Sequence, residues 1–304
     1  MKRLISIALI LSILVMILSG CSINGKGTFG AKEKEVISQL NSMKEQGNKP
    51  KEMFDYLNQN ISLLDKKGAT EALGILVGTL EEFETIYNER LFTENIPDLM
   101  FKYFEFKFDY NKIDSIKEQE LKDLLTDIVW GGFKIVDTEG TFMVVVDYDN
   151  LRTFNNNVDD EINTYIDIMA LRYNDPISID EGLAIAPEEL VNRIIQMENY
   201  LKSYDNNQRK EIMISMYEGY IMVYMSGTDN TPVFDFDTGT INPDMFKRFE
   251  TTASKQKDSV FGKILSKYVE LLKQEGFINT EKVQDFILNI DTIVIEELAN
   301  SNNK

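Results

Sequence analysis

The 304-residue sequence contains no histidine and only one cysteine. No disulfide bond can therefore form within the chain. Catalytic arrangements of the Ser-His-Asp and Cys-His types are excluded, and so are metal sites that depend on imidazole ligands. We therefore expect no metal, no cofactor and no recognisable catalytic residue.

Basic residues are few in comparison with acidic ones. The chain has 32 Lys and Arg residues against 50 Asp and Glu residues, which gives a formal charge of -18. Such a charge argues against nucleic acid as a partner, and it is repelled by anionic lipid head groups. The composition is otherwise that of a globular protein, with 43% hydrophobic residues and enough apolar material for a sizeable core.

The one long apolar stretch lies at the N-terminus. Lys2 and Arg3 precede residues 4–18, which are almost wholly apolar. This stretch is shorter than the roughly 20 residues that a membrane-spanning helix needs. A charged start, a short apolar run and an exit of small residues predict a secretory signal peptide over residues 1–20.

The exit from this stretch, Leu18-Ser19-Gly20-Cys21, resembles the lipobox of bacterial lipoproteins. The resemblance implies cleavage before Cys21, attachment of diacylglycerol to the Cys21 sulfur, and acylation of the new N-terminus. Two acyl chains hold a protein stably at a bilayer, whereas one holds it only marginally. We expect an extracytoplasmic protein at the outer face of a bacterial membrane, and an uncleaved N-terminal anchor would lead to the same place.

Beyond Cys21 the sequence predicts a tether and then a mainly α-helical body. Residues 21–32 are rich in small, flexible side chains and are expected to be a lipidated tether. The body divides into a region over 33–158 and a helical-hairpin region over 159–304. Apolar residues at helical spacing predict helices over the following ranges: 33–46, 50–64, 70–88, 115–129, 159–173, 187–204, 208–225, 242–255, 259–275 and 280–298.

Short signals mark the expected ends of some elements. Lys66-Lys67-Gly68 favours the end of a helix, and Ser178-Ile179-Asp180-Glu181 matches a capping box at the start of one. Residues 97–110 carry both a helix-start signal and an alternating apolar pattern, so helix and strand both stay open there. Two β-rich runs around a glycine-containing turn predict a central antiparallel hairpin over 133–148.

A weak internal repeat is visible in the second region. Ile214-Ser215-Met216-Tyr217 recurs as Leu265-Ser266-Lys267-Tyr268, each time in the second helix of an expected pair. Together with the segment 198–205, this resembles helical-hairpin arrays of the tetratricopeptide type, although their usual signature is incomplete. A compact helical bundle is the alternative. The expected fold class is therefore mainly α, either helical hairpins or a bundle, with one small β-hairpin.

The loop over residues 226–242 is the strongest candidate for a binding site. Loops longer than about 12–15 residues are uncommon and often functional. One interpretation packs its phenylalanines onto the helices while its aspartates face water, and the other makes it a loop that binds a ligand or partner. An EF-hand is excluded because the sixth and twelfth positions do not fit. The candidate residues are Asp229, Phe234, Asp235, Phe236 and Asp237.

Other residues suggest chemistry less strongly. Asp147-Tyr148-Asp149 after an apolar strand resembles the Asp-x-Asp of dehalogenase-like phosphatases, but the helices that follow do not, and an aspartate that caps the next helix is favoured. Trp130 is expected to fill core, with sugar stacking as the alternative. The acidic doublets at 159–160, 188–189 and 296–297 are candidates for the carboxylate pair of a glycosidase, but acids that suit the helix dipole or lie on a solvated helix face are favoured.

These observations favour a lipid-anchored surface protein of the bacterial cell envelope. We expect a non-catalytic protein-binding or scaffolding module, because side-by-side helical hairpins create grooves that suit peptide segments. Its expected partners are the membrane, through the lipid, and another envelope protein. A carboxylate-based hydrolase of cell-wall glycan is the alternative. A ligand-binding lipoprotein of a transporter is a third possibility, against which the scarcity of strands counts.

Overall fold

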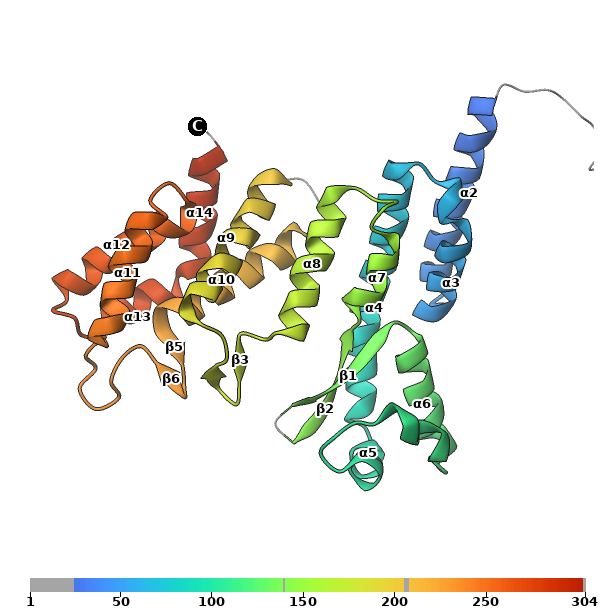
Figure 1. The fold of residues 1–304 in the computed structure, drawn as a ribbon, viewed down its shortest axis with the longest axis horizontal. Coiled ribbons are helices and arrows are strands. Elements are labelled where there is room, and N and C mark those ends of the chain that lie inside the picture. Colours follow the sequence, from blue (N-terminus) through green and yellow to red (C-terminus); the bar gives the residue numbers. More distant parts are fainter. Residues whose placement is uncertain (1–24, 139, 205–207, 303–304) are drawn as a thin grey trace, which may run out of the picture.

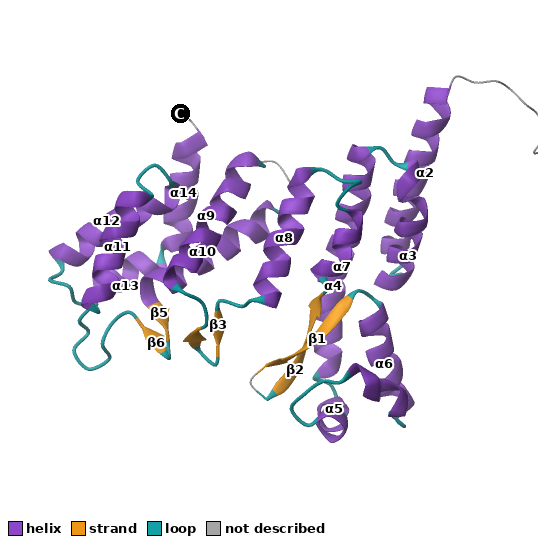
Figure 2. Cartoon of the chain, in the orientation of Figure 1, coloured by secondary structure: helices purple, strands orange, loops and turns teal. Residues whose placement is uncertain are grey.

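The computed structural model describes residues 25–138, 140–204 and 208–302, and the fold is mainly α-helical (Figures 1 and 2). This confirms the predicted fold class, including the small antiparallel hairpin near the middle of the chain. The signal peptide over 1–20 and the lipidation residue Cys21 lie outside the described residues. No helix in the described part of the chain is long and apolar enough to cross a membrane.

The first region contains helices, short 3₁₀ segments and the central hairpin, and its last element ends at Phe154. Its helices are α2 (Gly25–Glu45), α3 (Pro50–Asn60), α4 (Lys66–Leu91), α5 (Ile96–Phe104), α6 (Gln119–Trp130) and α7 (Tyr148–Leu151). The 3₁₀ segments are η1 (Ile61–Leu63), η2 (Tyr110–Ser115) and η3 (Arg152–Phe154), and the strands are β1 (Phe133–Thr138) and β2 (Thr141–Val146).

The second region consists of helices with two very short hairpins between them. The helices are α8 (Asp160–Asn174), α9 (Pro187–Ser203), α10 (Lys210–Ser226), α11 (Pro243–Lys255), α12 (Val260–Gln274), α13 (Glu281–Leu288) and α14 (Ile290–Asn302). The strands are β3 (Ser178–Ile179), β4 (Gly182–Leu183), β5 (Gly227–Thr228) and β6 (Thr231–Pro232). In Figure 1 the short hairpins lie along one edge of the row of helices.

The expected tether is partly wrong, because α2 begins at Gly25 and residues 25–32 are helical. Of the α2 side chains described, Val36, Leu40 and Met43 are buried and anchor the helix on the core. Extending an existing helix costs much less free energy than nucleating one, so α2 continues outward beyond its packed part. Its first turns project from the body as a stalk (Figure 1).

Helix starts follow the sequence signals where proline is present. Pro50, Pro187 and Pro243 each occupy the first turn of a helix, as predicted. The expected helix end at Lys66-Lys67-Gly68 is wrong, because these residues open α4. The carboxylate of Asp65 accepts a hydrogen bond from the Gly68 N–H at 2.8 Å and caps the helix start.

Two further elements differ from the sequence expectation. The expected capping box at Ser178–Glu181 is wrong, because Asp180 and Glu181 adopt positive φ angles of 47° and 57° and form the turn between β3 and β4. The expected helix over 280–298 is broken at Asn289, which lies between α13 and α14. Residues 96–104 are helical, so the ambiguous stretch is resolved as a helix followed by a turn.

The central hairpin is held by polar side chains of α4. Asn88 accepts a hydrogen bond from the Val144 N–H and donates one to the Val144 carbonyl, both at 2.8 Å. Glu84 accepts the Val146 N–H at 3.0 Å. An isolated two-stranded hairpin is marginally stable, and a free strand edge is prone to pair with other chains. The side chains of α4 satisfy this edge and stabilise the hairpin.

A series of buried glutamate–tyrosine hydrogen bonds connects the middle helices. Tyr165 of α8 donates to Glu81 of α4 at 2.5 Å. Tyr200 of α9 donates in turn to Glu161 of α8, and Tyr217 of α10 donates to a carboxylate of α9 at 2.8 Å. Buried polar groups that are fully paired specify how neighbouring helices align. These contacts fix the order α4, α8, α9, α10 through the core.

The repeated tetrapeptides occupy similar places in the fold. They lie in α10 and α12, each of which packs against the helix before it, and Tyr217 and Tyr268 are both fully buried. Their hydroxyl groups have different partners, since Tyr268 donates to the Met225 carbonyl at 3.4 Å. The similarity to tetratricopeptide-like arrays stays a prediction.

Candidate functional site

The loop that the sequence singled out is more ordered than a long open connection. It contains the β5–β6 hairpin, and a second narrow turn follows over residues 233–242. In that turn the Asp235 N–H donates to the Thr240 carbonyl at 2.9 Å, and the Asn242 N–H donates to the Val233 carbonyl at 2.9 Å. The loop is therefore held in one shape by its own backbone.

The second turn is also attached to the segment that precedes α13. The Ile241 N–H donates to the Phe277 carbonyl at 2.9 Å, and the Asn279 N–H donates to the Gly239 carbonyl at 2.8 Å. The carboxylate of Asp235 accepts the Thr238 N–H at 2.8 Å. This backbone hydrogen bond lowers the pKa of Asp235 below its usual value.

The two phenylalanines of the loop have different environments. Phe234 is buried, as the packing interpretation expects, whereas Phe236 is 79% exposed. Asp229, Asp235 and Asp237 are all exposed. The packing interpretation is therefore right for Phe234 and for the aspartates, and wrong for Phe236.

A recess of about 530 Å³ lies between this loop and α13. Its lining includes Phe234 and Phe236 from the loop and Ile287 and Leu288 from α13. Leu288 is 72% exposed, so two large apolar side chains stand at this recess without being covered by the described chain. Asn279 also lines it, and its Oδ1 atom has no hydrogen-bond partner. We call this feature the loop recess.

A second and longer feature follows one face of α9, and the sequence analysis missed it. Two recesses of about 450 and 420 Å³ share Asn192 and Gln256 and together form a groove. The α9 residues that line it follow helical spacing and are Pro187, Glu188, Val191, Asn192, Ile195, Gln196, Asn199, Tyr200 and Ser203. We call this feature the α9 groove. Its sequence signal is a polar face of α9 opposite the buried Leu190, Ile194 and Met197.

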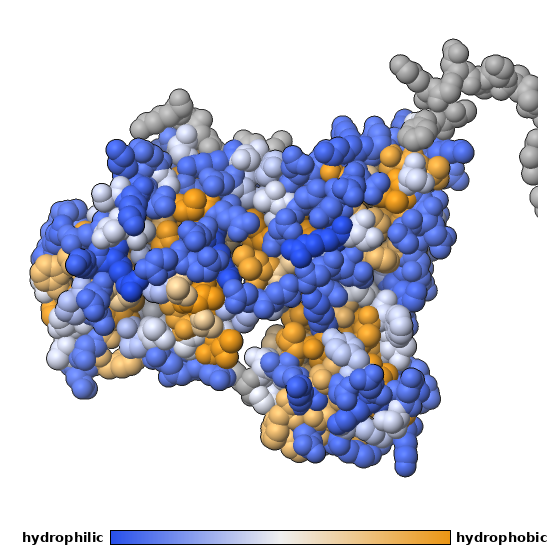
Figure 3. All heavy atoms as spheres, in the orientation of Figure 1, coloured by the Kyte–Doolittle hydropathy of each residue, from blue (hydrophilic) through white to orange (hydrophobic). Residues whose placement is uncertain are grey.

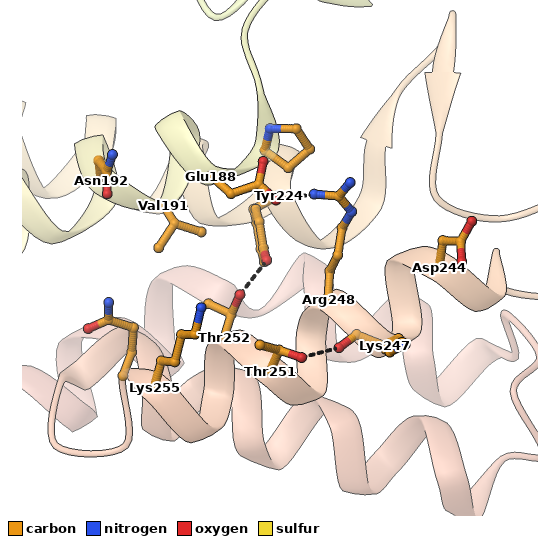
Figure 4. Close-up of a pocket in the computed structure, with 12 residues that line it drawn as sticks. Glu188, Val191, Asn192, Tyr224, Asp244, Lys247, Arg248, Thr251, Thr252 and Lys255 are labelled. Atoms are coloured by element: carbon orange, nitrogen blue, oxygen red, sulfur yellow. Dashed lines mark hydrogen bonds and ion pairs between the residues drawn. The ribbon is translucent and has the colours of Figure 1, made fainter.

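One end of the α9 groove lies between α9 and α11 (Figure 4). Side chains of the two helices converge there, and Tyr224 of α10 reaches between them. The Tyr224 hydroxyl lies 2.9 Å from the Thr252 hydroxyl, and burial raises the pKa of Tyr224. Arg248 of α11 pairs with Glu188 at the first turn of α9. Both helices are thereby fixed on the two sides of the groove.

Amide side chains are the common feature of the groove lining. Asn192, Gln196, Asn199 and Gln256 line it, together with hydroxyl groups of Thr164, Thr251, Thr252 and Ser203. Asn192 donates to Glu189 on its own helix at 3.2 Å. The amides of Gln196, Asn199 and Gln256 make no hydrogen bond to another side chain or backbone group of the described residues. Their donors and acceptors are available to a ligand.

Both carboxylates of the Asp-x-Asp sequence are paired with cations of the described chain. Lys134 Nζ lies 2.9 Å from both Asp147 Oδ1 and Asp149 Oδ2, and Arg152 donates to Asp149 at 2.5 Å. The hydrogen bond from Lys134 holds the pKa of Asp149 below its usual value. Asp147 stands at the start of α7 as predicted, but its carboxylate makes no capping hydrogen bond.

Trp130 contradicts the expectation that it fills core, because it is 68% exposed. It ends α6, whose buried face is formed by Leu121, Leu124, Leu125 and Ile128. Two positions along a helix correspond to about 200° of rotation, so Trp130 points away from the face that contains Ile128. The prediction rested on the large apolar side chain of Trp130. Its position on the helix, away from the buried face, explains why it is exposed.

Each acidic doublet that could form a glycosidase pair has at least one carboxylate paired with a cation. Lys66 Nζ lies 3.9 Å from carboxylate oxygens of both Asp159 and Asp160. Glu188 pairs with Arg248, Glu189 pairs with Arg193 at 3.1 Å, and Glu297 pairs with Lys267 at 2.7 Å. Each doublet therefore contributes to packing between elements.

Figure 3 shows a largely hydrophilic surface on the face in view, with hydrophobic patches on the lobe that contains β1, β2 and α5 and also along the row of helices. Across the described residues no three Asp, Glu, Cys or His side chains are grouped so that they could hold a metal ion.

Comparisons of the chain with known protein families, with curated proteins and with solved structures found no match.

Proposed function

We propose that the protein is a lipid-anchored, non-catalytic protein-binding module of the bacterial cell envelope, and that the α9 groove holds an extended polypeptide segment. The lipobox sequence around Cys21 supports the location. The free amide groups of Gln196 and Asn199 on α9 and of Gln256 at the end of α11, which line one groove, are the observation that supports the binding role.

Amides suit this role because each one carries both donors and an acceptor. An extended peptide offers unpaired N–H and C=O groups along its whole length, and Gln196, Asn199 and Gln256 can pair with either kind. Recognition of this sort depends on the peptide backbone more than on its side chains. Val191 and Ile195 add apolar surface between the amides for the side chains of the segment.

The dimensions of the groove set the length of the segment. At a rise of about 1.5 Å per residue, the 17 residues of α9 extend about 25 Å. An extended peptide advances about 3.3 Å per residue, so about seven or eight residues fit along the groove. A segment of this length is a typical recognition motif. The ion pairs made by the acidic doublets give the alternative of a glycan hydrolase no support.

Site-specific photocrosslinking in cells tests this proposal. A photoreactive amino acid replaces Asn199 in the groove, and a matched protein carries it at Glu270, an exposed residue of α12 outside the groove. We expect a defined segment of an envelope protein to crosslink at position 199 and not at 270. Equal crosslinking at both positions, or none at 199, would overturn the proposal.

Binding of the mapped segment to purified protein provides the second measurement. The double variant Gln196→Ala with Asn199→Ala removes two amides without touching the core. We expect it to weaken binding roughly tenfold, since each lost hydrogen bond contributes about 0.5–1.5 kcal/mol. The Glu270→Gln variant is expected to bind as tightly as the wild type.

A further inference from the structure

Residues 226–242 contain three aspartates and no basic residue. Phe236 stands between Asp235 and Asp237, and all three side chains are exposed. On the other side of the loop recess, α13 presents the exposed Glu281 and Asp285. Asp235 itself lines the recess, and the other acidic side chains lie on the same loop and on the same helix as its apolar lining.

The one cation on this part of α13 is already paired among the described residues. Lys282 Nζ lies 2.8 Å from Glu275 Oε1, and this hydrogen bond lowers the pKa of Glu275 and raises that of Lys282. The negative charges of the loop are not neutralised in this way, because no ion pair within the described chain involves Asp229, Asp235 or Asp237. A partner with cationic side chains would supply the missing counter-charges.

The backbone that carries the exposed aromatic residue of this surface is held in one shape. Phe236 lies on a turn that is closed by the Gly239 N–H, which donates to the Asp235 carbonyl at 2.8 Å. A rigid aromatic side chain loses little conformational entropy when it is buried by a partner. Residues of this kind, surrounded by polar groups, are enriched among the residues that dominate binding energy at interfaces.

We propose that the loop recess is a second docking surface, separate from the α9 groove, for a protein segment that carries Lys or Arg side chains around a large apolar residue. The apolar residue packs between Phe236 and Leu288. The cationic side chains face Asp229, Asp237 and Asp285. Charge complementarity decides the orientation, and apolar contact supplies most of the affinity.

The probe for this surface is the peptide Lys-Lys-Phe-Leu-Lys-Lys with blocked ends, titrated calorimetrically against the full-length protein. Two reference peptides replace either the lysines by glutamates or the Phe-Leu pair by Gly-Gly. We expect binding of the first peptide, weaker binding at higher salt, and at least tenfold weaker binding of both reference peptides. No binding of the first peptide would overturn the proposal, as would equal binding of either reference.

Variants assign the binding to the loop recess. We expect Phe236→Ala to weaken binding at least tenfold, whereas Ile295→Ala, which truncates a 56%-exposed side chain of α14, leaves it unchanged. The double variant Asp229→Asn with Asp237→Asn removes two charges without touching the hydrogen bonds of Asp235, and is expected to reduce the salt dependence. Equal effects of Phe236→Ala and Ile295→Ala would show adventitious binding and contradict the proposal.

Discussion

At the scale of single residues, Glu198 is a buried carboxylate that accepts hydrogen bonds from four donors. Its side chain belongs to α9 and is almost completely buried, with 1% of its surface exposed. It accepts hydrogen bonds from the Val260 and Phe261 N–H groups at 2.8 and 2.9 Å, and from Tyr217 and Lys202 at 2.8 and 2.5 Å. Glu198 therefore caps the start of α12 from a different helix. Its four hydrogen-bond donors match the four acceptor sites of a carboxylate.

Replacing Glu198 by alanine should be strongly destabilising. Two backbone N–H groups and one hydroxyl would lose their buried acceptor, and Lys202 would lose its carboxylate. We expect the free energy of unfolding, measured by urea denaturation, to fall by about 3–5 kcal/mol. The control Glu270→Ala removes an exposed carboxylate and should change it by less than about 0.5 kcal/mol. A loss below about 1 kcal/mol for Glu198→Ala would contradict this account.

Sequence reasoning identified Glu198 only as part of a possible repeat. A glutamate in a helix is usually solvated, and its burial here depends on where α10 and α12 lie. The same holds for the groove amides, which look like an ordinary polar helix face until α8 and α11 are placed beside them. Residue type alone could not distinguish these cases, because the deciding contacts come from distant parts of the chain.

Among elements, helix type and approximate extent could be predicted well where periodicity was long and a proline marked the start. The β1–β2 hairpin was also predictable, because two β-rich runs flanked a turn. Signals of two or three residues were less reliable. Lys66-Lys67-Gly68 fits a helix end by charge and glycine, yet Asp65 immediately before it provides a cap that makes it a start. The stalk at Gly25 was missed because small residues suggested flexibility.

Gly227 at the end of α10 fixes the direction in which the loop leaves the helix. Its φ and ψ angles are 80° and -162°, a region that residues with a Cβ atom rarely adopt. A Cβ atom there would lie 2.3 Å from the Thr231 carbonyl oxygen and 2.8 Å from the Val233 nitrogen, so the β5–β6 hairpin would have to move.

We expect Gly227→Ala to lower the free energy of unfolding by about 2–4 kcal/mol in urea denaturation, from backbone strain and the close contacts together. Gly219→Ala in the same helix is the matched control. A Cβ atom at Gly219 meets nothing within 4 Å, so this change should stabilise the protein by about 0.5–1 kcal/mol. Equal effects of the two substitutions would contradict the role assigned to Gly227.

For the whole molecule, one continuous hydrophobic core extends from Val36 in α2 to Val294 in α14. The two regions expected from the sequence are therefore joined by packing. The Asp159 N–H, at their boundary, donates to the Thr70 hydroxyl at 2.7 Å, and Tyr165 reaches across to Glu81. This single body presents the α9 groove and the loop recess as separate surfaces, which suits a protein that brings partners together.

The helical stalk changes how the body would be held at a membrane. An extended tether over residues 22–32 could reach about 35–40 Å. Residues 25–32 of this segment are helical, so they span only about 12 Å instead of roughly 26–29 Å, and a helix is stiffer than an extended chain. If Cys21 carries the lipid, the body is held closer to the bilayer and in a more restricted orientation than a flexible tether would allow.

The state of Cys21 is the most direct test of the central claim that this is a lipid-anchored envelope protein. The measurement is mass spectrometry of the mature protein extracted from the membrane fraction with detergent. We predict an N-terminal peptide that begins at Cys21 and carries diacylglycerol on its sulfur, and release of a Cys21→Ser variant from the membrane fraction. An unmodified Cys21 preceded by residues 1–20 in a cytosolic product would contradict the account.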